Sequence, residues 1–398
     1  MKLLLTLMML VAPAGLRAQV IDDMDVNRFL DPEPTKAGDV RGISTAVAGP
    51  VGEAVTFAFE DMNRNAFFRR EIAADSTWDR SDGFSFLLKG DGSDGVGGLE
   101  WIGAGNFERR YAVAFSLRDT SWTRVTALWR DVIPELSRIP FLDTEDFGPG
   151  DFGHLMLGKW YYWRDYGPHS FSVDDVRLEG EIEAGAEPAL PAGDPLGRVK
   201  AKLARGDSVT IVLMGDSLTD YRHWANREVN WPTLLKARLN SASRSAVQII
   251  NTAIGGTELN QNLILMPGWV DTVKADLVTV CFGYNDWSSR GRGLQFEASA
   301  RYAVDRIRRL TGAEVLLMTT APAVERWTEM EEMAEAIRGT SADRRTGLVD
   351  VAAVLHAIGD GDLEARGNLF VRDNVHLGPP GHEAVAEAVA RALLEEAE

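Results

Sequence analysis

Hydrophobic and polar positions follow two different patterns along the chain. In the first half, short segments at 54–59, 83–88 and 110–116 alternate between apolar and polar residues, and glycine- and aspartate-rich turns such as 89–95 separate them. Many short alternating strands joined by turns are typical of an antiparallel β-sandwich. We therefore expect residues 20–182 to form a β-sandwich domain.

The second half alternates predicted strands with predicted helices. The apolar runs expected to be buried strands are 209–214, 247–250, 277–282, 315–318 and 348–350. The segments with helical character are 231–239, 296–310, 323–337 and 381–395. This order predicts an α/β three-layer sandwich over residues 198–398, in which helices cover both faces of a parallel sheet.

A proline-rich joint separates the two patterns. Pro188, Pro191 and Pro195 lie in a stretch without apolar periodicity, which is typical of a linker over residues 183–197. A length of 398 residues also fits two domains better than one.

The first 18 residues have the features of an export signal. Lys2 precedes an apolar run at 3–12, and Ala18 offers a small residue before a cleavage point. This arrangement predicts a signal peptide over residues 1–18 and a secreted or periplasmic protein. No later apolar run approaches the roughly 20 residues that a membrane span needs, so we expect no such span.

Charge and cysteine content narrow the possible partners. The net charge is −17, and it becomes −19 when Lys2 and Arg17 are removed with the signal. An acidic protein repels phosphate backbones, so we expect no nucleic-acid partner. Cys281 is the single cysteine, which excludes an internal disulfide, and its apolar strand predicts a core position.

Polar residues suited to acyl transfer follow several of the predicted strands. Ser217 comes after the first strand of the second half, Gly256 after the second and Asn285 after the third, while Asp373 and His376 lie near the end. Loops at the carboxyl ends of parallel strands gather at one edge of the sheet. We therefore expect these five residues to form one site.

Each of these residues has a chemical role in ester cleavage. Ser217 would attack the ester carbonyl, His376 would accept and return its proton, and Asp373 would orient the imidazole. The N–H groups of Ser217 and Gly256 and the amide of Asn285 would form the oxyanion hole. No metal-ligand spacing occurs in this half, so no metal is predicted.

Four short sequence blocks carry a family resemblance. Gly-Asp-Ser-Leu at 215–218, the glycines at 255–256, Gly-Tyr-Asn-Asp at 283–286 and Asp-Asn-Val-His at 373–376 resemble, in order, the blocks of SGNH (GDSL) hydrolases. The resemblance covers residues 207–398 and implies the same catalytic and oxyanion roles. Gly255, next to Gly256, remains an alternative oxyanion donor.

The other common serine-hydrolase plan does not fit. An α/β-hydrolase elbow needs glycine two residues after the serine, where this chain has Thr219. Asp216 and Asp286 are expected to make structural hydrogen bonds, and His382 is expected to be structural. His223 and Trp224 are expected in a surface loop, with lining of the pocket as the alternative.

The first half also resembles known domains. Segments 21–24, 86–92 and 171–178 are similar to galactose-binding-type jelly rolls, among them the complex I intermediate-associated protein 30 type and family-11-type carbohydrate-binding modules. The resemblance implies a jelly roll that binds glycans. It also implies a structural calcium ion, for which the acids at 22–23 and 174–175 could supply oxygens.

Aromatic residues are abundant in this half. Six of the eleven tryptophans lie there, and the stretch 159–166 is especially aromatic. Trp160, Tyr162 and Trp163 are therefore expected to stack on sugars, with core packing as the alternative for each ring.

Together these features predict a secreted serine esterase that removes acetyl groups from a polysaccharide or oligosaccharide without a cofactor, apart from the structural calcium. Two alternatives remain open. One is a lipid esterase or lysophospholipase with the same catalytic residues, and the other is a glycan-binding protein without catalytic activity.

Overall fold

The computed structural model describes residues 19–30, 42–60, 65–143, 145–160 and 167–395. The expected signal peptide at 1–18 and the residues Tyr162 and Trp163 lie outside these ranges. Within them, no helix is both long enough and apolar enough to cross a membrane.

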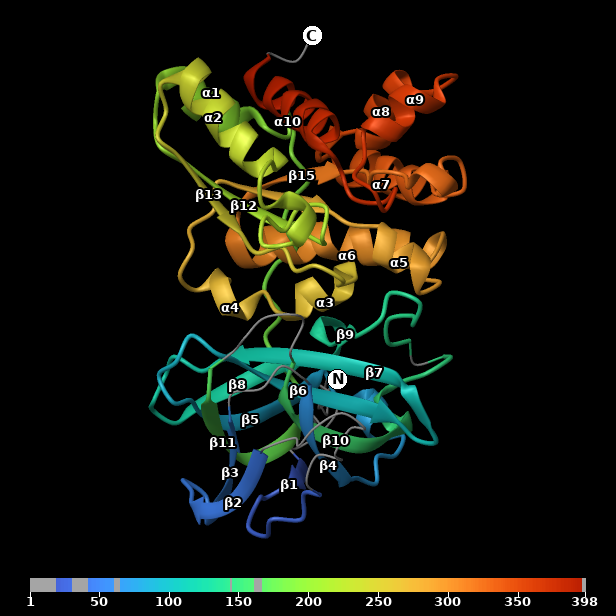
Figure 1. The fold of residues 1–398 in the computed structure, drawn as a ribbon. Helices are drawn as coiled ribbons and strands as arrows, with labels where there is room; N and C mark the ends of the chain where they lie inside the picture. Colours follow the sequence, from blue (N-terminus) through green and yellow to red (C-terminus); the bar gives the residue numbers. More distant parts are fainter. Residues whose placement is uncertain (1–18, 31–41, 61–64, 144, 161–166, 396–398) are drawn as a thin grey trace, which may run out of the picture.

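The first half consists of two antiparallel sheets that face each other, which confirms the predicted β-sandwich (Figure 1). The first sheet contains β2 (Gly42–Ala48), β3 (Glu53–Phe59), β11 (His169–Glu179), β5 (Gly83–Lys89) and β8 (Thr123–Leu128) in that order, and β1 (Gln19–Asp22) pairs with β11. The second contains β4 (Ala66–Glu71), β10 (Phe152–Lys159), β6 (Val96–Gly103), β7 (Asn106–Ser116) and β9 (Ile133–Pro134).

Large aromatic side chains fill the space between these two sheets. The rings of Phe84 and Trp101 meet edge to face with their centroids 5.0 Å apart, and Trp129 lies 5.9 Å from Trp101. Phe84 of β5 and Trp101 of β6 point inward because successive side chains of a strand point to opposite faces, and Trp129 joins them from the 3-10 turn after β8. The aromatic residues of this half therefore serve mainly as core.

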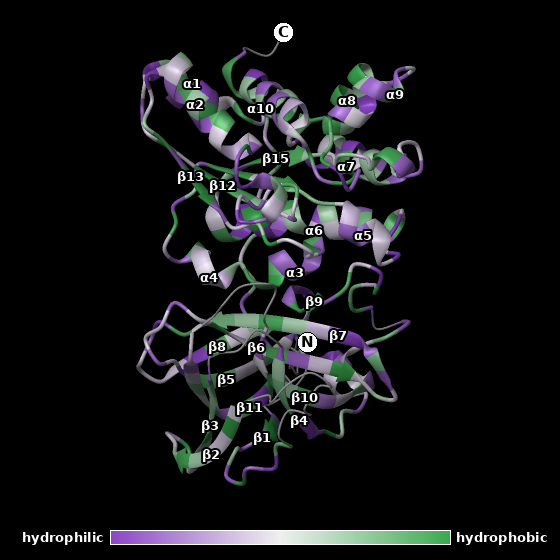
Figure 2. Cartoon of the chain, viewed as in Figure 1, coloured by the Kyte–Doolittle hydropathy of each residue, from purple (hydrophilic) through white to green (hydrophobic). Residues whose placement is uncertain are grey.

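The second half contains one parallel sheet, as predicted. Its strands, in spatial order, are β13 (Val247–Asn251), β12 (Val209–Gly215), β14 (Leu277–Cys281), β15 (Glu314–Met318) and β16 (Gly347–Val349). Figure 2 shows hydrophobic residues along the strands of this sheet. Strands that are buried on both faces need such continuous apolar sequences.

Helices cover both faces of the parallel sheet (Figure 1). Ile211 and Leu213 of β12 pack into the cluster on one face, and Val212 and Met214 pack into the cluster on the other. The first face is covered by α1 (Gly197–Arg205), α2 (Trp231–Ser243), α8 (Val351–Gly359) and α10 (Pro379–Leu394). The second is covered by α3 (Leu259–Ile264), α4 (Pro267–Val270), α6 (Leu294–Thr311) and α7 (Glu331–Arg344).

One predicted helix begins later than expected. The pattern predicts a helix from 323 to 337, but α7 starts at Glu331 and continues to Arg344. The segment before it forms a short 3-10 turn, Val324–Arg326, in which the N–H of Val324 donates to the carbonyl of Asn374. This tertiary hydrogen bond holds residue 324 against the loop that carries His376.

The two halves share one hydrophobic core. The outer face of the second sheet places Val96, Ala112, Ala114 and Trp160 in the same buried cluster as side chains of α3, α4 and α6. Figure 1 shows β7 and β9 directly beside α3 and α4. The first half is therefore packed against the parallel-sheet domain by apolar contact, and the linker is not the sole connection between them.

The joint between the halves is also held in place. Glu187 in the proline-rich segment pairs with Arg130 of the first half at 2.9 Å and with Arg309 of α6 at 3.4 Å. Arg309 also pairs with Asp131. The segment predicted to be a linker therefore contacts both domains through the ion pairs of Glu187.

The sugar-contact prediction for Trp160 is wrong. Its side chain is 1% exposed, its ring contacts Phe67 at 5.1 Å, and its Nε1 donates to Glu100 at 2.8 Å. A Cβ atom at Gly98 would come within 2.3 Å of the indole, so the strand presses against the ring. No face of Trp160 is open to a ligand, because the ring lies in the shared core.

Two of the four acids expected to bind calcium are paired with arginine side chains. Asp22 pairs with Arg70, and the carboxylate of Asp175 pairs with both Arg124 and Arg177. Asp174 is buried and its Oδ2 accepts the N–H of Val51 at 3.0 Å, so the calcium site stays a prediction. Across the described residues, no cluster of three or more histidine, cysteine or acidic side chains is arranged to hold a metal ion.

The shared core predicts that the chain unfolds as one unit. We expect a single calorimetric transition for the wild type, and we expect Trp160→Ala to lower the free energy of unfolding by about 3–5 kcal/mol. The substitution opens a cavity between the halves and removes the donor to buried Glu100. Two transitions, with only one of them shifted by the substitution, would contradict a shared core.

Candidate active site

The strand order brings the predicted residues together. Ser217 follows β12 in the middle of the sheet, Gly256 follows the neighbouring β13, and Asn285 lies in α5 (Tyr284–Ser288) after the other neighbour, β14. Because parallel strands end at the same edge, the three loops meet there. All three residues line one cavity together with His376.

Ser217, His376 and Asp373 form a continuous hydrogen-bonded chain. His376 Nε2 lies 2.9 Å from the Oγ of Ser217, and His376 Nδ1 lies 2.7 Å from Oδ2 of Asp373. These distances are those of a serine–histidine–aspartate triad in which the imidazole can accept the hydroxyl proton.

A tight turn fixes the acid against the base. Asn374 takes a left-handed conformation with φ of 61°, and Oδ1 of Asp373 accepts the N–H groups of Val375 and His376 at 3.0 Å each. Partial burial alone would raise the pKa of Asp373, but these N–H groups and the imidazole hold it below its usual value. The carboxylate is therefore ionised and aimed at Nδ1.

The structure favours Gly256 over Gly255 as the second oxyanion donor. The N–H of Gly255 already donates to Asp220 at 3.2 Å. In the part of the chain that the structure describes, the N–H groups of Ser217 and Gly256 have no hydrogen-bond partner. Gly256 has a φ of +79°, which glycine adopts at little cost, so the loop can turn this donor into the cavity.

The amide of Asn285 is held in place by the glycine loop. Its Nδ2 donates to the carbonyl oxygen of Thr257 at 3.0 Å, which uses one of its two N–H bonds. The second N–H bond remains available to a ligand in the cavity. Three donors thus surround the space next to the Ser217 hydroxyl.

Two buried carboxyl groups brace these loops, as expected from the sequence. Asp216 accepts the N–H of Leu218 at 2.9 Å, and Asp286 accepts the N–H of Leu259 at 3.1 Å. Burial raises the pKa of Asp216 to about 7. Burial and the nearby Glu258 raise the pKa of Asp286 to about 8. Neither group contacts the triad hydroxyl directly, so their role is to shape the loops.

The cavity at the triad has a volume of about 590 Å³, and charged and aromatic side chains are among those that line it. Besides the triad serine and histidine and the oxyanion residues, its lining comprises Asp220, Arg222, His223, Trp224, Arg227, Gly255 and Tyr284. Sequence reasoning favoured a surface loop for His223 and Trp224, whereas both line the cavity. Their closeness to Ser217 along the chain was the available signal.

His223 stacks on the catalytic imidazole. The two ring centroids are 4.2 Å apart, and the Nδ1 atom of His223 accepts the N–H of Ala225 at 3.4 Å. Burial and the neighbouring His376 lower the pKa of His223 to about 4, so this ring is neutral at neutral pH. A neutral ring beside His376 adds no repulsion when His376 becomes an imidazolium.

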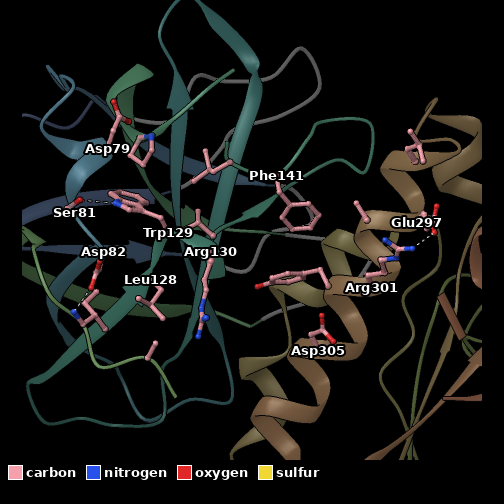
Figure 3. A pocket seen from close by; sticks show the side chains of 18 of the residues that line it. Asp79, Ser81, Asp82, Leu128, Trp129, Arg130, Phe141, Glu297, Arg301 and Asp305 are labelled. Carbon is pink, nitrogen blue, oxygen red and sulfur yellow. Dashed lines mark hydrogen bonds and ion pairs between the residues drawn. The ribbon is translucent and has the colours of Figure 1, made fainter. Parts of the chain in front are cut away.

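A larger cavity lies between the two halves, away from the triad (Figure 3). Its volume is about 780 Å³, and its wall includes Trp129 and Arg130 of the first half and Arg301 and Asp305 of α6. None of the triad or oxyanion residues lines it. The chemistry of ester cleavage therefore belongs to the smaller cavity.

The helix-covered parallel sheet and the serine–histidine–aspartate triad define a serine ester hydrolase with an α/β fold, distinct from the α/β-hydrolase plan that Thr219 excludes. Residues 213–384 match the sequence model of the GDSL-like lipase/acylhydrolase family. The second half of the chain is therefore a GDSL-type esterase domain, which confirms the family resemblance of the four blocks. A comparison of the sequence with curated proteins found no match.

Several solved structures are similar to parts of the chain. An acetylxylan esterase from Geobacillus stearothermophilus is 19% identical, with 48% of this chain and 97% of that chain covered and a TM-score of 0.40. Another acetyl xylan esterase is 25% identical over 47% of this chain and 100% of its own, also with a TM-score of 0.40. A family 11 carbohydrate-binding module from Clostridium thermocellum is 15% identical over 42% of this chain and 98% of its own, with a TM-score of 0.34.

The raised pKa of Asp286 predicts a pH-dependent stability. In the unfolded chain this carboxyl has a pKa of about 3.9, so between about pH 4 and pH 8 the folded state holds a proton that the unfolded state releases. The wild type should therefore lose stability through this group as pH rises in that window. Asp286→Asn keeps the acceptor for Leu259 and has no such proton.

We expect the urea midpoint of Asp286→Asn, relative to the wild type, to increase between about pH 5 and about pH 8. Leu294→Ala, on the exposed end of α6, serves as a control whose difference from the wild type stays constant. A constant difference for Asp286→Asn as well would show that Asp286 is ionised in the folded protein.

Proposed function

We propose that this chain hydrolyses ester-linked acetyl groups on a carbohydrate through an acyl-enzyme formed at Ser217. The observation that carries the proposal is the unbroken hydrogen-bonded chain from Asp373 through His376 to the Ser217 hydroxyl, which opens into a cavity with charged and aromatic side chains in its wall. The reaction needs no cofactor, because the triad supplies nucleophile, acid and base.

Acylation begins when Ser217 Oγ attacks the ester carbonyl and its proton moves to His376 Nε2. The resulting oxyanion accepts hydrogen bonds from the N–H groups of Ser217 and Gly256 and from the amide of Asn285. Each such donor is worth about 2.7–4 kcal/mol in the transition state. Asp373 stabilises the imidazolium, which then gives its proton to the leaving alcohol as the C–O bond breaks.

Deacylation repeats these steps with water. His376 takes a proton from the water molecule, the water oxygen attacks the acyl carbon, and the same donors hold the second oxyanion. The C–O bond to Ser217 then breaks, and the serine oxygen recovers a proton from His376. The products are the free carboxylic acid and the regenerated hydroxyl.

The cavity wall supports a sugar ester as the substrate. Asp220, Arg222 and Arg227 place charged groups around the triad, and such groups suit hydroxyl-bearing rings better than a long acyl chain. Trp224 is 47% exposed beside His376, with ring centroids 5.8 Å apart. An exposed indole next to the catalytic base offers a flat face on which a sugar ring can stack.

Export and glycan binding by the first half are also part of the proposal. The signal-like sequence at 1–18 supports a secreted or periplasmic protein that meets polymeric substrates. With Trp160 in the core, sugar contact by Tyr162 and Trp163 stays a prediction, since both lie outside the described residues.

The first experiment measures acetate released from a panel of acetylated polysaccharides by the mature protein. We expect release by the wild type and a loss of about 10⁴-fold or more in Ser217→Ala, because the substitution removes the nucleophile. Equal release by the variant would rule out the mechanism. Absence of any hydrolysis by the wild type, on these or longer esters, would favour a binding protein without catalytic activity.

The second experiment distinguishes sugar esters from lipid esters. We expect Trp224→Ala to lower kcat/KM for an acetylated oligosaccharide about five- to tenfold, with an effect of less than about twofold on ethyl acetate, since only the sugar stacks on the indole. Tyr221→Ala is the matched control, because Tyr221 is 48% exposed on the same loop and does not line the cavity. A kcat/KM that increases from acetate to octanoate esters would favour the lipid alternative.

A further inference from the structure

A single carboxylate joins the first half of the chain to the oxyanion hole. Oε2 of Glu258 accepts both the N–H and the Oγ–H of Ser137, each at 2.7 Å. Oε1 of the same side chain lies 2.5 Å from the Oγ of Ser289, which follows α5. Ser137 belongs to the β-sandwich half, a few residues after β9, so this contact crosses the interface between the halves.

Glu258 lies between the two loops that carry oxyanion donors. It comes two residues after Gly256, and its neighbour Thr257 accepts the Asn285 amide at 3.0 Å. On its other side, the N–H of Leu259 donates to Asp286 at 3.1 Å. A shift of Glu258 would therefore move the glycine loop and change the support of the Asn285 amide together.

The carboxylate of Glu258 is buried, so it depends on the few protein groups that donate hydrogen bonds to it. Ser137 is 0% exposed and Glu258 is 5% exposed. A Cβ atom at Gly291 would lie 2.2 Å from the Oγ of Ser137, so the backbone on the far side packs directly on the hydroxyl. A buried carboxylate that loses a donor carries a desolvation cost that water cannot readily remove here.

The same hydroxyl also faces the carboxyl group of Asp286. Ser137 therefore lies beside the carboxyl groups of Glu258 and Asp286, which are close in sequence to the residues that carry the oxyanion donors.

We propose that Ser137 is a positioning residue for ester cleavage: through Glu258 it holds the Gly256 N–H and the Asn285 amide at the oxyanion. The β-sandwich then forms part of the catalytic apparatus in addition to any role in binding glycans. This inference rests on the proposed hydrolysis at Ser217 and extends it to a residue of the other half.

The test measures kcat and KM for 4-nitrophenyl acetate with the full chain. We expect Ser137→Ala to lower kcat about tenfold with KM changed less than about twofold, because the oxyanion forms only in the transition state. Ser289→Ala removes the other donor to Glu258 from a partly exposed position, and we expect the same division between kcat and KM. Arg118→Gln is the matched control, since Arg118 donates across the interface to the Gly268 carbonyl, away from the oxyanion loops. We expect it to keep the wild-type kcat.

A double-mutant cycle between Ser137→Ala and Glu258→Gln separates positioning from general loss of stability. If the two residues act through one contact, the double variant should be no slower than Glu258→Gln alone. Multiplying effects on kcat, or a Ser137→Ala enzyme with wild-type kcat, would overturn the inference. An equal loss of kcat in Arg118→Gln would also overturn it, because the interface as a whole would then be responsible.

The outcomes also distinguish this inference from the proposed function. A wild type without Ser217-dependent hydrolysis would contradict the proposed function itself. An active wild type whose kcat is unaffected by Ser137→Ala and Ser289→Ala would leave the proposed function intact and contradict only the positioning role.

Discussion

The order of three parallel strands is the constraint on which the site depends. Since β12 lies between β13 and β14, the loop with Ser217 emerges between the loop with Gly256 and the helix with Asn285. Hydrogen bonding between adjacent strands sets the distance between the ends of the strands, and therefore the distance between the loops that carry the three residues. The imidazole of His376 then needs only a short turn before α10 to reach the serine hydroxyl.

The architecture of each half could be predicted from the sequence because its patterns are local. Alternation of apolar and polar residues identified β3, β5 and β7, and the apolar runs identified all five strands of the parallel sheet. The start of α7 could not be found in this way, since the apolar pattern does not distinguish the 3-10 turn Val324–Arg326 from the helix that begins at Glu331. The shared core was missed because an apolar outer face on a β-strand does not reveal its partner.

The catalytic residues were accessible to sequence reasoning because each follows a strand of recognisable pattern. The positions of the aromatic residues outside the triad were harder to predict from the sequence. His223 and Trp224 belong to a loop without periodicity, and Trp160 carries a side chain that suits a sugar platform as well as it suits a core. Only the three-dimensional neighbours decide between these roles, as Glu100 and Phe67 do for Trp160.

The apolar contact between the halves has a consequence for how such chains can be rearranged. Domains joined only by a flexible linker each have a polar, solvent-exposed surface, so one domain can be exchanged for another without exposing a core. Here, a GDSL-type half separated from its β-sandwich would expose the parts of α3 and α4 that now pack on β7 and β9 in a shared apolar cluster, and exposed apolar surface promotes self-association. Recombination among relatives should therefore preserve the two halves as an inherited pair, with compensating changes in one half following substitutions in the other.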